Sequence, residues 1–129
     1  MTKYTLTLLF PNSINKSKVT QVDYQVTGEP AIQPPLVQNQ MPATFAVNDT
    51  LTFTYQKANK DIEINSSLLT QYNIAISQKE VDEDFSDQFD KPIIVTDSFK
   101  GSWVFHLLGM YKSNDKQAAY YLDPEFTCS

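Results

Sequence analysis

Apolar residues alternate with polar ones in several short runs along the chain. In the first run, Tyr4, Leu6 and Leu8 are separated by single residues that are mostly threonine. A period of two is typical of a β-strand with one buried face. Alternation of this kind predicts about eight strands. They fall near residues 4–10, 22–26, 45–55, 62–64, 72–76, 92–96, 102–111 and 118–128.

One segment breaks this alternation and follows a helical spacing instead. Ser77 and Glu80 form the first and last positions of a capping box, a common start of a helix. Three apolar residues follow at four-residue intervals, which places them on one helical face: Val81, Phe85 and Phe89. The segment therefore predicts one short amphipathic helix near 78–88, with a proline just beyond its end.

The order of these elements favours an all-β fold. Several short strands with turn signals between them are typical of sandwiches, whereas a parallel sheet would need a helix between most strands. The proline-rich segment 29–43 reads as a long connecting loop, because proline cannot donate to a strand ladder. We expect one domain, 1–129, folded as an antiparallel, jelly-roll-like β-sandwich.

Composition narrows the classes of function. All ten basic residues are lysine, and the net charge is −5. Arginine is the preferred partner of phosphate and guanine, so this composition argues against nucleic-acid binding and against a basic membrane patch. The single cysteine, Cys128, excludes an intrachain disulfide and a cysteine zinc cluster. The N-terminal run lacks the features of a signal peptide, so we expect a soluble cytoplasmic protein. We also expect no cofactor.

Most of the negative charge lies in one segment. Residues 78–91 hold six carboxylates and two lysines, and thus a charge of −4. Calcium prefers several carboxylate oxygens, so a calcium site is one hypothesis, with Asp82, Asp84 and Asp87 as ligands. The glycine and terminal glutamate of an EF-hand are absent, however. A solvated face of the predicted helix is the favoured interpretation.

Residue His106 is the only histidine and lies between apolar neighbours. Acid–base or nucleophilic catalysis requires a histidine beside a serine, cysteine or carboxylate, and no such arrangement stands out. A hydrogen-bonded histidine in the core or in an interface is favoured. We therefore expect a protein that is not an enzyme.

Aromatic residues gather in the last two predicted strands and suggest a surface that binds sugars. The candidate ligand-binding residues are Trp103, Tyr111, Tyr120 and Tyr121. The alternative is that they are core or cross-strand partners, as aromatic residues in strands usually are. Because Tyr120 and Tyr121 are adjacent, they must face opposite ways, so at least one lies outside the main core.

The stretch 103–108 is apolar on both faces apart from His106, which favours a strand that packs on a core and on a second chain. Pro124 in the final run favours an edge strand or a bulge, where another chain could approach. The predicted subunit contact therefore includes His106, Pro124 and Phe126.

The closing segment also carries a family resemblance. Tyr120, Tyr121, Asp123, Pro124 and Phe126 follow an apolar strand and a turn, and residues 45–53 form a Val-Asn-Asp strand with Asn48 in place of glycine. Together they resemble the PixA/AidA-like inclusion-body proteins. The resemblance implies a jelly-roll-like sandwich that is intracellular, accumulates in quantity and has no established enzyme activity. It carries over no catalytic residue.

The sequence thus predicts a non-enzymatic β-sandwich that acts by self-assembly, as a homo-oligomer, or by binding a protein partner. A carbohydrate- or calcium-dependent binding module is the first alternative. A small acidic immunity or inhibitor protein is the second, and rests only on the charged segment.

Overall fold

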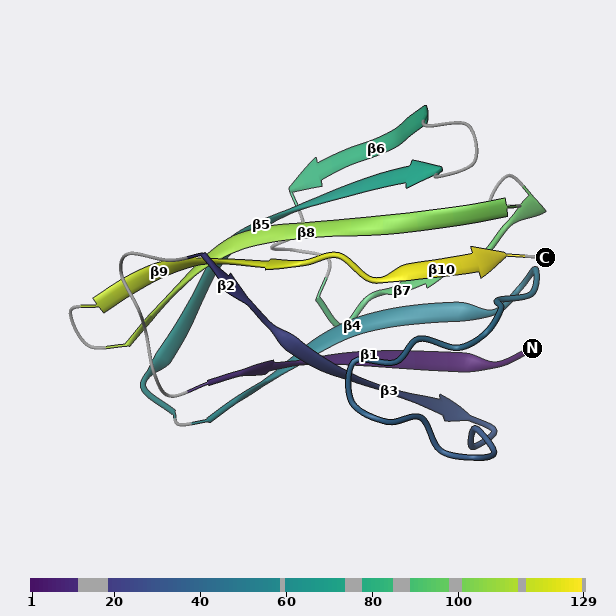
Figure 1. Ribbon diagram of the computed structural model, residues 1–129, viewed down its shortest axis with the longest axis horizontal. Helices are drawn as coiled ribbons and strands as arrows, with labels where there is room; N and C mark the ends of the chain where they lie inside the picture. The colour runs from purple at the N-terminus through teal and green to yellow at the C-terminus, as the bar shows by residue number, and fades with distance from the viewer. Residues whose placement is uncertain are drawn as a thin grey trace.

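A computed structural model gives the fold (Figure 1). It describes residues 1–11, 19–58, 60–73, 78–84, 89–97, 101–113 and 116–128, and the side chains of 65–73, 78–84, 102–108 and 113 are left out of that description. The described residues form ten strands in two sheets, which confirms the predicted all-β class.

The smaller sheet has four strands in the order β3-β1-β4-β7. Their bounds are β3 Asp23–Glu29, β1 Lys3–Phe10, β4 Thr50–Lys57 and β7 Pro92–Ile94. Strand β1 pairs antiparallel with β3 but parallel with β4, and β7 closes the sheet antiparallel to β4. A parallel neighbour requires a long crossover, and the proline-rich segment before β4 is part of that connection.

The larger sheet has six strands, five of them in the order β2-β9-β8-β5-β6, with β10 also paired to β8. Their bounds are β2 Thr20–Gln21, β9 Lys116–Leu122, β8 Gly101–Ser113, β5 Ile62–Asn73, β6 Gln78–Asp84 and β10 Glu125–Cys128. All pairs are antiparallel except β2 with β9. The purely antiparallel expectation is therefore wrong, because each sheet contains a parallel pair. The jelly-roll connectivity stays a prediction.

The helix predicted near 78–88 is wrong over its first seven residues, which form strand β6. This strand pairs antiparallel with β5, from Leu68↔Asp84 to Asn73↔Gln78, and is the outermost strand of its sheet (Figure 1). Capping and spacing are local signals, and tertiary pairing overrides them where a long neighbouring strand offers its open edge. Residues 85–88 lie outside the described residues.

The two sheets pack face to face around an aromatic core. The Phe10 ring on β1 contacts Tyr111 and Tyr120 of the other sheet, at ring-centroid distances of 5.5 and 4.9 Å. The Phe45 ring joins Tyr4 to Phe126 in the same way. The alternating residues of both sheets supply the rest of the core: Leu6, Leu8, Val22, Tyr24, Val26, Leu51, Phe53, Ile62, Val95, Ala118, Leu122 and Cys128. The period of two in the sequence therefore does mark the buried faces.

Strands β9 and β10 act as one long strand with a short interruption at Asp123-Pro124. Buried and more exposed residues alternate without a break from Ala118 to Cys128. The register to β8 is Leu107↔Leu122 before the interruption and Val104↔Glu125 after it, three residues further on each strand. The bulge expected as one explanation of Pro124 is therefore absent. We call residues 116–128 the closing strand.

A buried carboxylate, Asp49, fixes the loop that leads into β4. Its Oδ1 accepts a hydrogen bond from the Thr2 backbone N–H at 2.7 Å, and its Oδ2 accepts one from Ala46 N–H at 2.8 Å. Its backbone carbonyl accepts a bond from Val95 N–H. The preceding Asn48 has a φ of 76°, a left-handed conformation that asparagine tolerates better than most residues. Asp49 thus ties the N-terminus, the Phe45 loop and the end of β7 together.

Among the residues that the structure describes, no helix has the length and apolar character needed to span a membrane.

Candidate functional site

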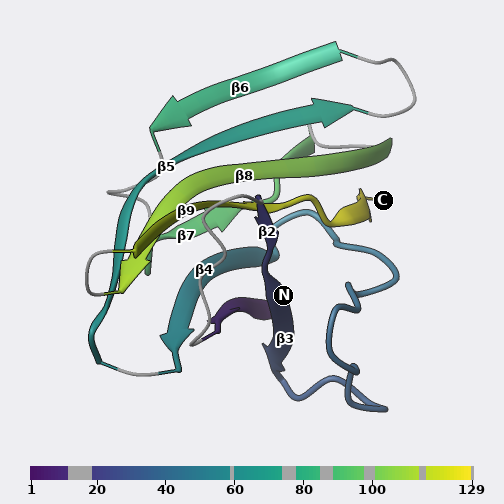
Figure 2. The same ribbon diagram turned by 60° about the vertical axis from the view of Figure 1, so that its left-hand side comes forward.

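A polar cleft lies where the chain leaves one sheet for the other. β2 pairs with β9, and the chain then continues into β3 of the smaller sheet (Figure 2). The Val22 N–H donates to the Tyr121 carbonyl at 3.0 Å, just before the two segments separate. The wedge that opens has a volume of about 380 Å³. It is lined by Gln21, Asp23, Tyr24, Asn39, Leu122, Asp123, Pro124 and Glu125.

One wall of the cleft is held rigid by Asn39. Its Oδ1 accepts a bond from Tyr24 N–H at 2.9 Å, and its own N–H donates to the Tyr24 carbonyl at 2.8 Å. The Tyr24 hydroxyl donates to the Asn39 carbonyl at 3.0 Å, and Asn39 Nδ2 donates to Asp23 Oδ1 at 2.9 Å. Asn39 has a φ of 64°. Because four hydrogen bonds fix this wall, the cleft exists without a ligand.

The cleft is strongly acidic. The carboxylates of Asp23, Asp123 and Glu125 are exposed in it, and none of the described residues that line it is a lysine. Burial raises the pKa of the Tyr24 hydroxyl, and the negative charge of Asp123 raises it further. Tyr24 therefore stays a neutral hydrogen-bonding group beside the three carboxylates.

These carboxylates do not meet at one point. In the part of the chain that the structure describes, no three His, Cys, Asp or Glu side chains are grouped so as to hold a metal ion. A calcium ion needs six to eight oxygens at about 2.3–2.6 Å.

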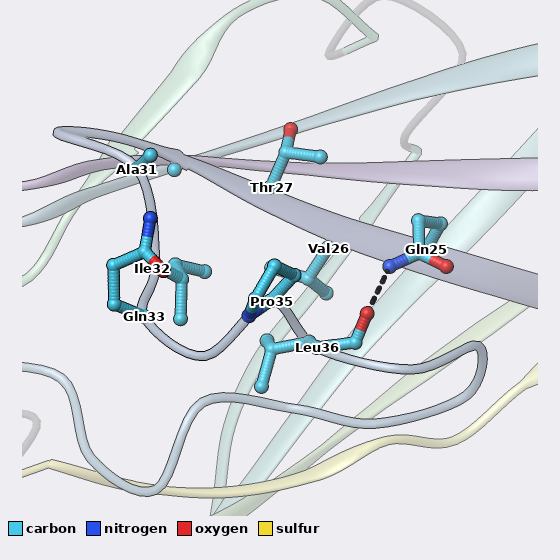
Figure 3. A pocket seen from close by; sticks show the side chains of 9 residues that line it. Gln25, Val26, Thr27, Ala31, Ile32, Gln33, Pro35 and Leu36 are labelled. Carbon is cyan, nitrogen blue, oxygen red and sulfur yellow. Dashed lines mark hydrogen bonds between the residues drawn. The ribbon is translucent and has the colours of Figure 1, made fainter.

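A second, smaller cavity lies further along β3. It has a volume of about 170 Å³ and is bounded by strand residues 25–28 and by Ala31, Ile32, Gln33, Pro35 and Leu36 of the proline-rich loop (Figure 3). The Gln25 side chain donates from Nε2 to the Leu36 carbonyl at 2.8 Å and thereby joins loop to strand (Figure 3). This loop covers part of the open edge of β3, which is a common way to protect an edge strand.

Two of the four aromatic residues predicted to bind a ligand are core residues. Tyr111 and Tyr120 are 0% exposed, so the prediction that they form a surface platform is wrong. The Tyr111 hydroxyl, which donates to Thr20 Oγ1 at 3.1 Å, joins β8 to β2. Tyr121 is half-buried on the opposite face, as its alternation with Tyr120 requires. The side chain of Trp103 lies outside the described ones.

The predicted subunit contact is also partly wrong. Pro124 is buried, and Phe126 is 7% exposed with its ring against Phe45, so neither side chain is available to a second chain. Both point inward because they occupy the even positions of the closing strand. The side chain of His106 is outside the described residues, although its backbone pairs with Thr70 in β5.

The predicted calcium ligands are not tested by the structure. Asp82 and Asp84 belong to strand β6 rather than to a helix, and Asp87 lies outside the described residues. The site therefore stays a prediction.

Sequence reasoning did not find the cleft, because its walls come from segments about 100 residues apart in the chain. One signal was present. Pro124 stands inside a strand-like run, and proline within a strand is mostly confined to edge strands and bulges. Nothing in the sequence alone connects this proline to Asp23 or Asn39.

No protein-family description, no curated protein and no solved structure matches this chain.

Proposed function

We propose that this protein is a non-enzymatic binding module whose polar cleft takes a cationic group rich in hydrogen-bond donors. The observation that carries the proposal is the cleft itself, a preformed hollow of about 380 Å³ whose described lining residues include three carboxylates and no lysine. Ligand sites are typically hollows of ~300–1,000 Å³ with a few placed polar groups. Ammonium and guanidinium groups complement such a surface.

The electrostatics of the cleft support this choice of ligand. Attraction between exposed charges is screened over about 10 Å at 0.1 M salt, so the three carboxylates act mainly on a group inside the hollow. The tyrosine hydroxyl, the asparagine amide and the backbone oxygens around them add uncharged hydrogen-bonding groups. A bare cation would satisfy few of these groups at once, whereas a polyamine, a lysine side chain or an arginine side chain reaches several.

A titration followed by amide NMR shifts tests the proposal, with spermidine and calcium chloride as separate probes. We expect saturable shifts at Asp23, Asn39, Asp123 and Glu125 with spermidine. The triple variant Asp23→Asn/Asp123→Asn/Glu125→Gln should weaken spermidine binding at least tenfold. A matched variant, Glu29→Gln/Asp90→Asn/Asp97→Asn, removes three carboxylates outside the cleft lining and should leave binding nearly unchanged.

Two results would count against the proposal. An absence of saturable shifts when spermidine is added to the wild-type protein would exclude the proposal. An equal loss in both variants would show that spermidine responds only to net charge. Strong binding of calcium with no response to spermidine would instead support the calcium-dependent alternative.

Self-assembly is the second candidate function. The observation that favours it is the edge strand β7, where Ile94 is 56% exposed and where β4 is the one partner strand that the described residues provide. Light scattering after gel filtration tests it. A concentration-dependent dimer that Ile94→Lys abolishes would support assembly through this edge, and a monomer at high concentration would exclude it.

A further inference from the structure

The outer edge of the closing strand is covered at two points. At one point the Val22 N–H donates to the Tyr121 carbonyl at 3.0 Å, and at the other the Phe45 N–H donates to the Thr127 carbonyl at 2.8 Å. Both covering segments run parallel to the closing strand. Tyr121 and Thr127 therefore direct their carbonyls away from β8, toward the outer edge.

Between these two points the edge is open. Along a strand in an antiparallel pair, the backbone N–H and C=O of one residue point to one side, and those of the next point to the other. The register to β8 has the same offset before and after Asp123-Pro124, so Glu125 directs its backbone groups outward. The same alternation, carried across the interruption, places the backbone groups of Asp123 outward as well. No backbone partner for either residue on this side is seen among the described residues.

Pro124 does not close this gap. By the same alternation, its nitrogen faces β8 rather than the outer edge, and its ring is buried. The missing N–H therefore weakens the pairing with β8 at one position but leaves the outward donors of Asp123 and Glu125 in place. Proline on an edge strand commonly prevents pairing with a further strand, but the position of Pro124 leaves the outer edge able to pair.

The open edge and the acidic cleft are one feature, because Asp123, Pro124 and Glu125 line the cleft. We propose that the ligand is an extended basic peptide that adds to this edge as a short strand. Its main chain pairs with the outward N–H and C=O groups of Asp123 and Glu125, and a lysine or arginine side chain lies among the three carboxylates. Main-chain pairing supplies affinity in such complexes, and side-chain pockets supply specificity.

This inference rests on the proposed cation-binding function and adds the main-chain contact, so its test separates the two. The probes are acetyl-Thr-Val-Lys-Val-Thr-amide, the same peptide N-methylated at the lysine and at the valine after it, and lysine amide. All three carry a cationic side chain, but the methylated peptide lacks a donor on whichever side faces the protein, because the N–H groups of consecutive strand residues point to opposite sides. We expect the unmodified peptide to bind at least tenfold more tightly than either of the others.

Hydrogen exchange of the protein backbone supplies an independent readout. The unmodified peptide should slow exchange of the Asp123 and Glu125 amides at least tenfold, while lysine amide should not. The variant Glu125→Pro removes one outward donor and should weaken peptide binding, whereas Glu125→Ala keeps the donor and serves as its control. Since the proline variant can perturb folding, the exchange measurement on the wild-type protein carries the test without it.

The results of these experiments distinguish strand addition from cation binding alone. Equal binding of the methylated and unmodified peptides would overturn strand addition and leave the cation site intact. An absence of binding by all three probes would overturn both proposals. Amides of Asp123 and Glu125 that are already protected in the free protein would show that the edge is not open, and would also overturn strand addition.

Discussion

The two outer edges of the six-stranded sheet differ in how they are protected. At one edge, β5 is the one partner of β6 among the described strands, and four of the seven β6 residues are carboxylates. At the other, the closing strand is covered by β2 and by the Phe45 bridge, with an opening only at the cleft. Open edges invite pairing with other chains, and natural proteins restrict this with charge or with covering segments. This protein uses charge on one edge and covering segments on the other.

Because the two edges are protected differently, the acidic residues of β6 and those of the cleft have different explanations. Carboxylates in β6 are spread along the last strand of the sheet in the described order, where like charges on two copies of the chain would repel each other. The three carboxylates in the cleft lie beside a short open stretch between two bridges and next to a wall fixed by Asn39. Only the second arrangement combines charge with a defined hollow, so the binding proposals concern that edge alone.

The largest effect should follow from removing the carboxylate that holds the Phe45 bridge. Asp49→Ala leaves the N–H groups of Thr2 and Ala46 without their acceptor. Hydrogen bonds to a charged group contribute ~1.5–3 kcal/mol each, so we expect a loss of about 3 kcal/mol in the free energy of unfolding. Urea denaturation followed by tryptophan fluorescence measures it.

The exposed carboxylate of Asp97 provides the control. Asp97→Asn should change the free energy of unfolding by less than about 0.5 kcal/mol. Asp49→Asn keeps one side-chain acceptor, so its loss in the free energy of unfolding should lie between those of Asp49→Ala and Asp97→Asn. A cost below about 1 kcal/mol for Asp49→Ala would mean that the Phe45 bridge does not depend on this carboxylate.

A methyl group at Gly109 tests the packing behind the closing strand. A Cβ there would lie 2.6 Å from Cε1 of Tyr120, which is fully buried and directly opposite in the register. Gly109→Ala should cost about 1–3 kcal/mol, since overpacked cores must shift side chains or backbone. At Gly28 the nearest atom is Cγ1 of half-buried Ile32 at 3.0 Å, so Gly28→Ala should cost less. If the two variants unfolded at equal urea concentrations, the close packing of Tyr120 on Gly109 would be refuted.

Much of the fold follows from alternation, but the pairing of strands does not. The runs at Tyr4–Phe10 and Ala118–Cys128 mark their buried faces correctly, because one face meets the core and the other meets water. The helical reading of 78–84 failed because the open edge of β5, which no local pattern reveals, supplies the competing hydrogen bonds. Parallel pairing of β1 with β4 was equally invisible, since alternation carries no information on strand direction.

The site was less accessible to sequence reasoning than the fold. Aromatic residues were the natural candidates for a binding surface, but Tyr111 and Tyr120 are the largest fully buried side chains among those that the structure describes. The cleft instead depends on Asn39, whose four contacts with Tyr24 and Asp23 arise only when a loop folds back on β3. A long-range geometry of this kind leaves no periodic signal.

The thiol of Cys128 reports on the covered edge through its titration. Burial raises its pKa to about 11, and the negative charge of Asp49 contributes to the rise. An unfolded cysteine ionises near pH 8.5–9, so the folded state retains a proton that the unfolded state loses. The stabilisation is complete below that range and is lost as the pH rises toward 11, by at most ~1.4 kcal/mol per pH unit.

A comparison with Cys128→Ala isolates this contribution, because the lysines and tyrosines titrate alike in both proteins. The wild-type free energy of unfolding should fall more steeply than that of the variant between pH 9 and 11. Parallel curves would show that the thiol ionises equally in both states and that this end of the closing strand is open to water.

The smallest effect on stability, and the sharpest contrast between the edges, should come from neutralising charge. Asp82→Asn/Glu83→Gln/Asp84→Asn and the cleft variant Asp23→Asn/Asp123→Asn/Glu125→Gln both change the net charge from −5 to −2. Each substitution replaces a carboxylate with the amide of the same shape, so we expect the free energy of unfolding to change by only about 0.5 kcal/mol per site. Self-association should nevertheless rise mainly in the β6 variant, because the outer edge of a seven-residue strand loses its repulsion there, whereas the cleft exposes only a short stretch. Light scattering at equal protein concentration measures the difference, and 0.5 M sodium chloride should bring the wild-type protein closer to the β6 variant by screening. Equal association of both variants would assign the effect to net charge alone, and stronger association of the cleft variant would identify the closing strand as the more reactive edge.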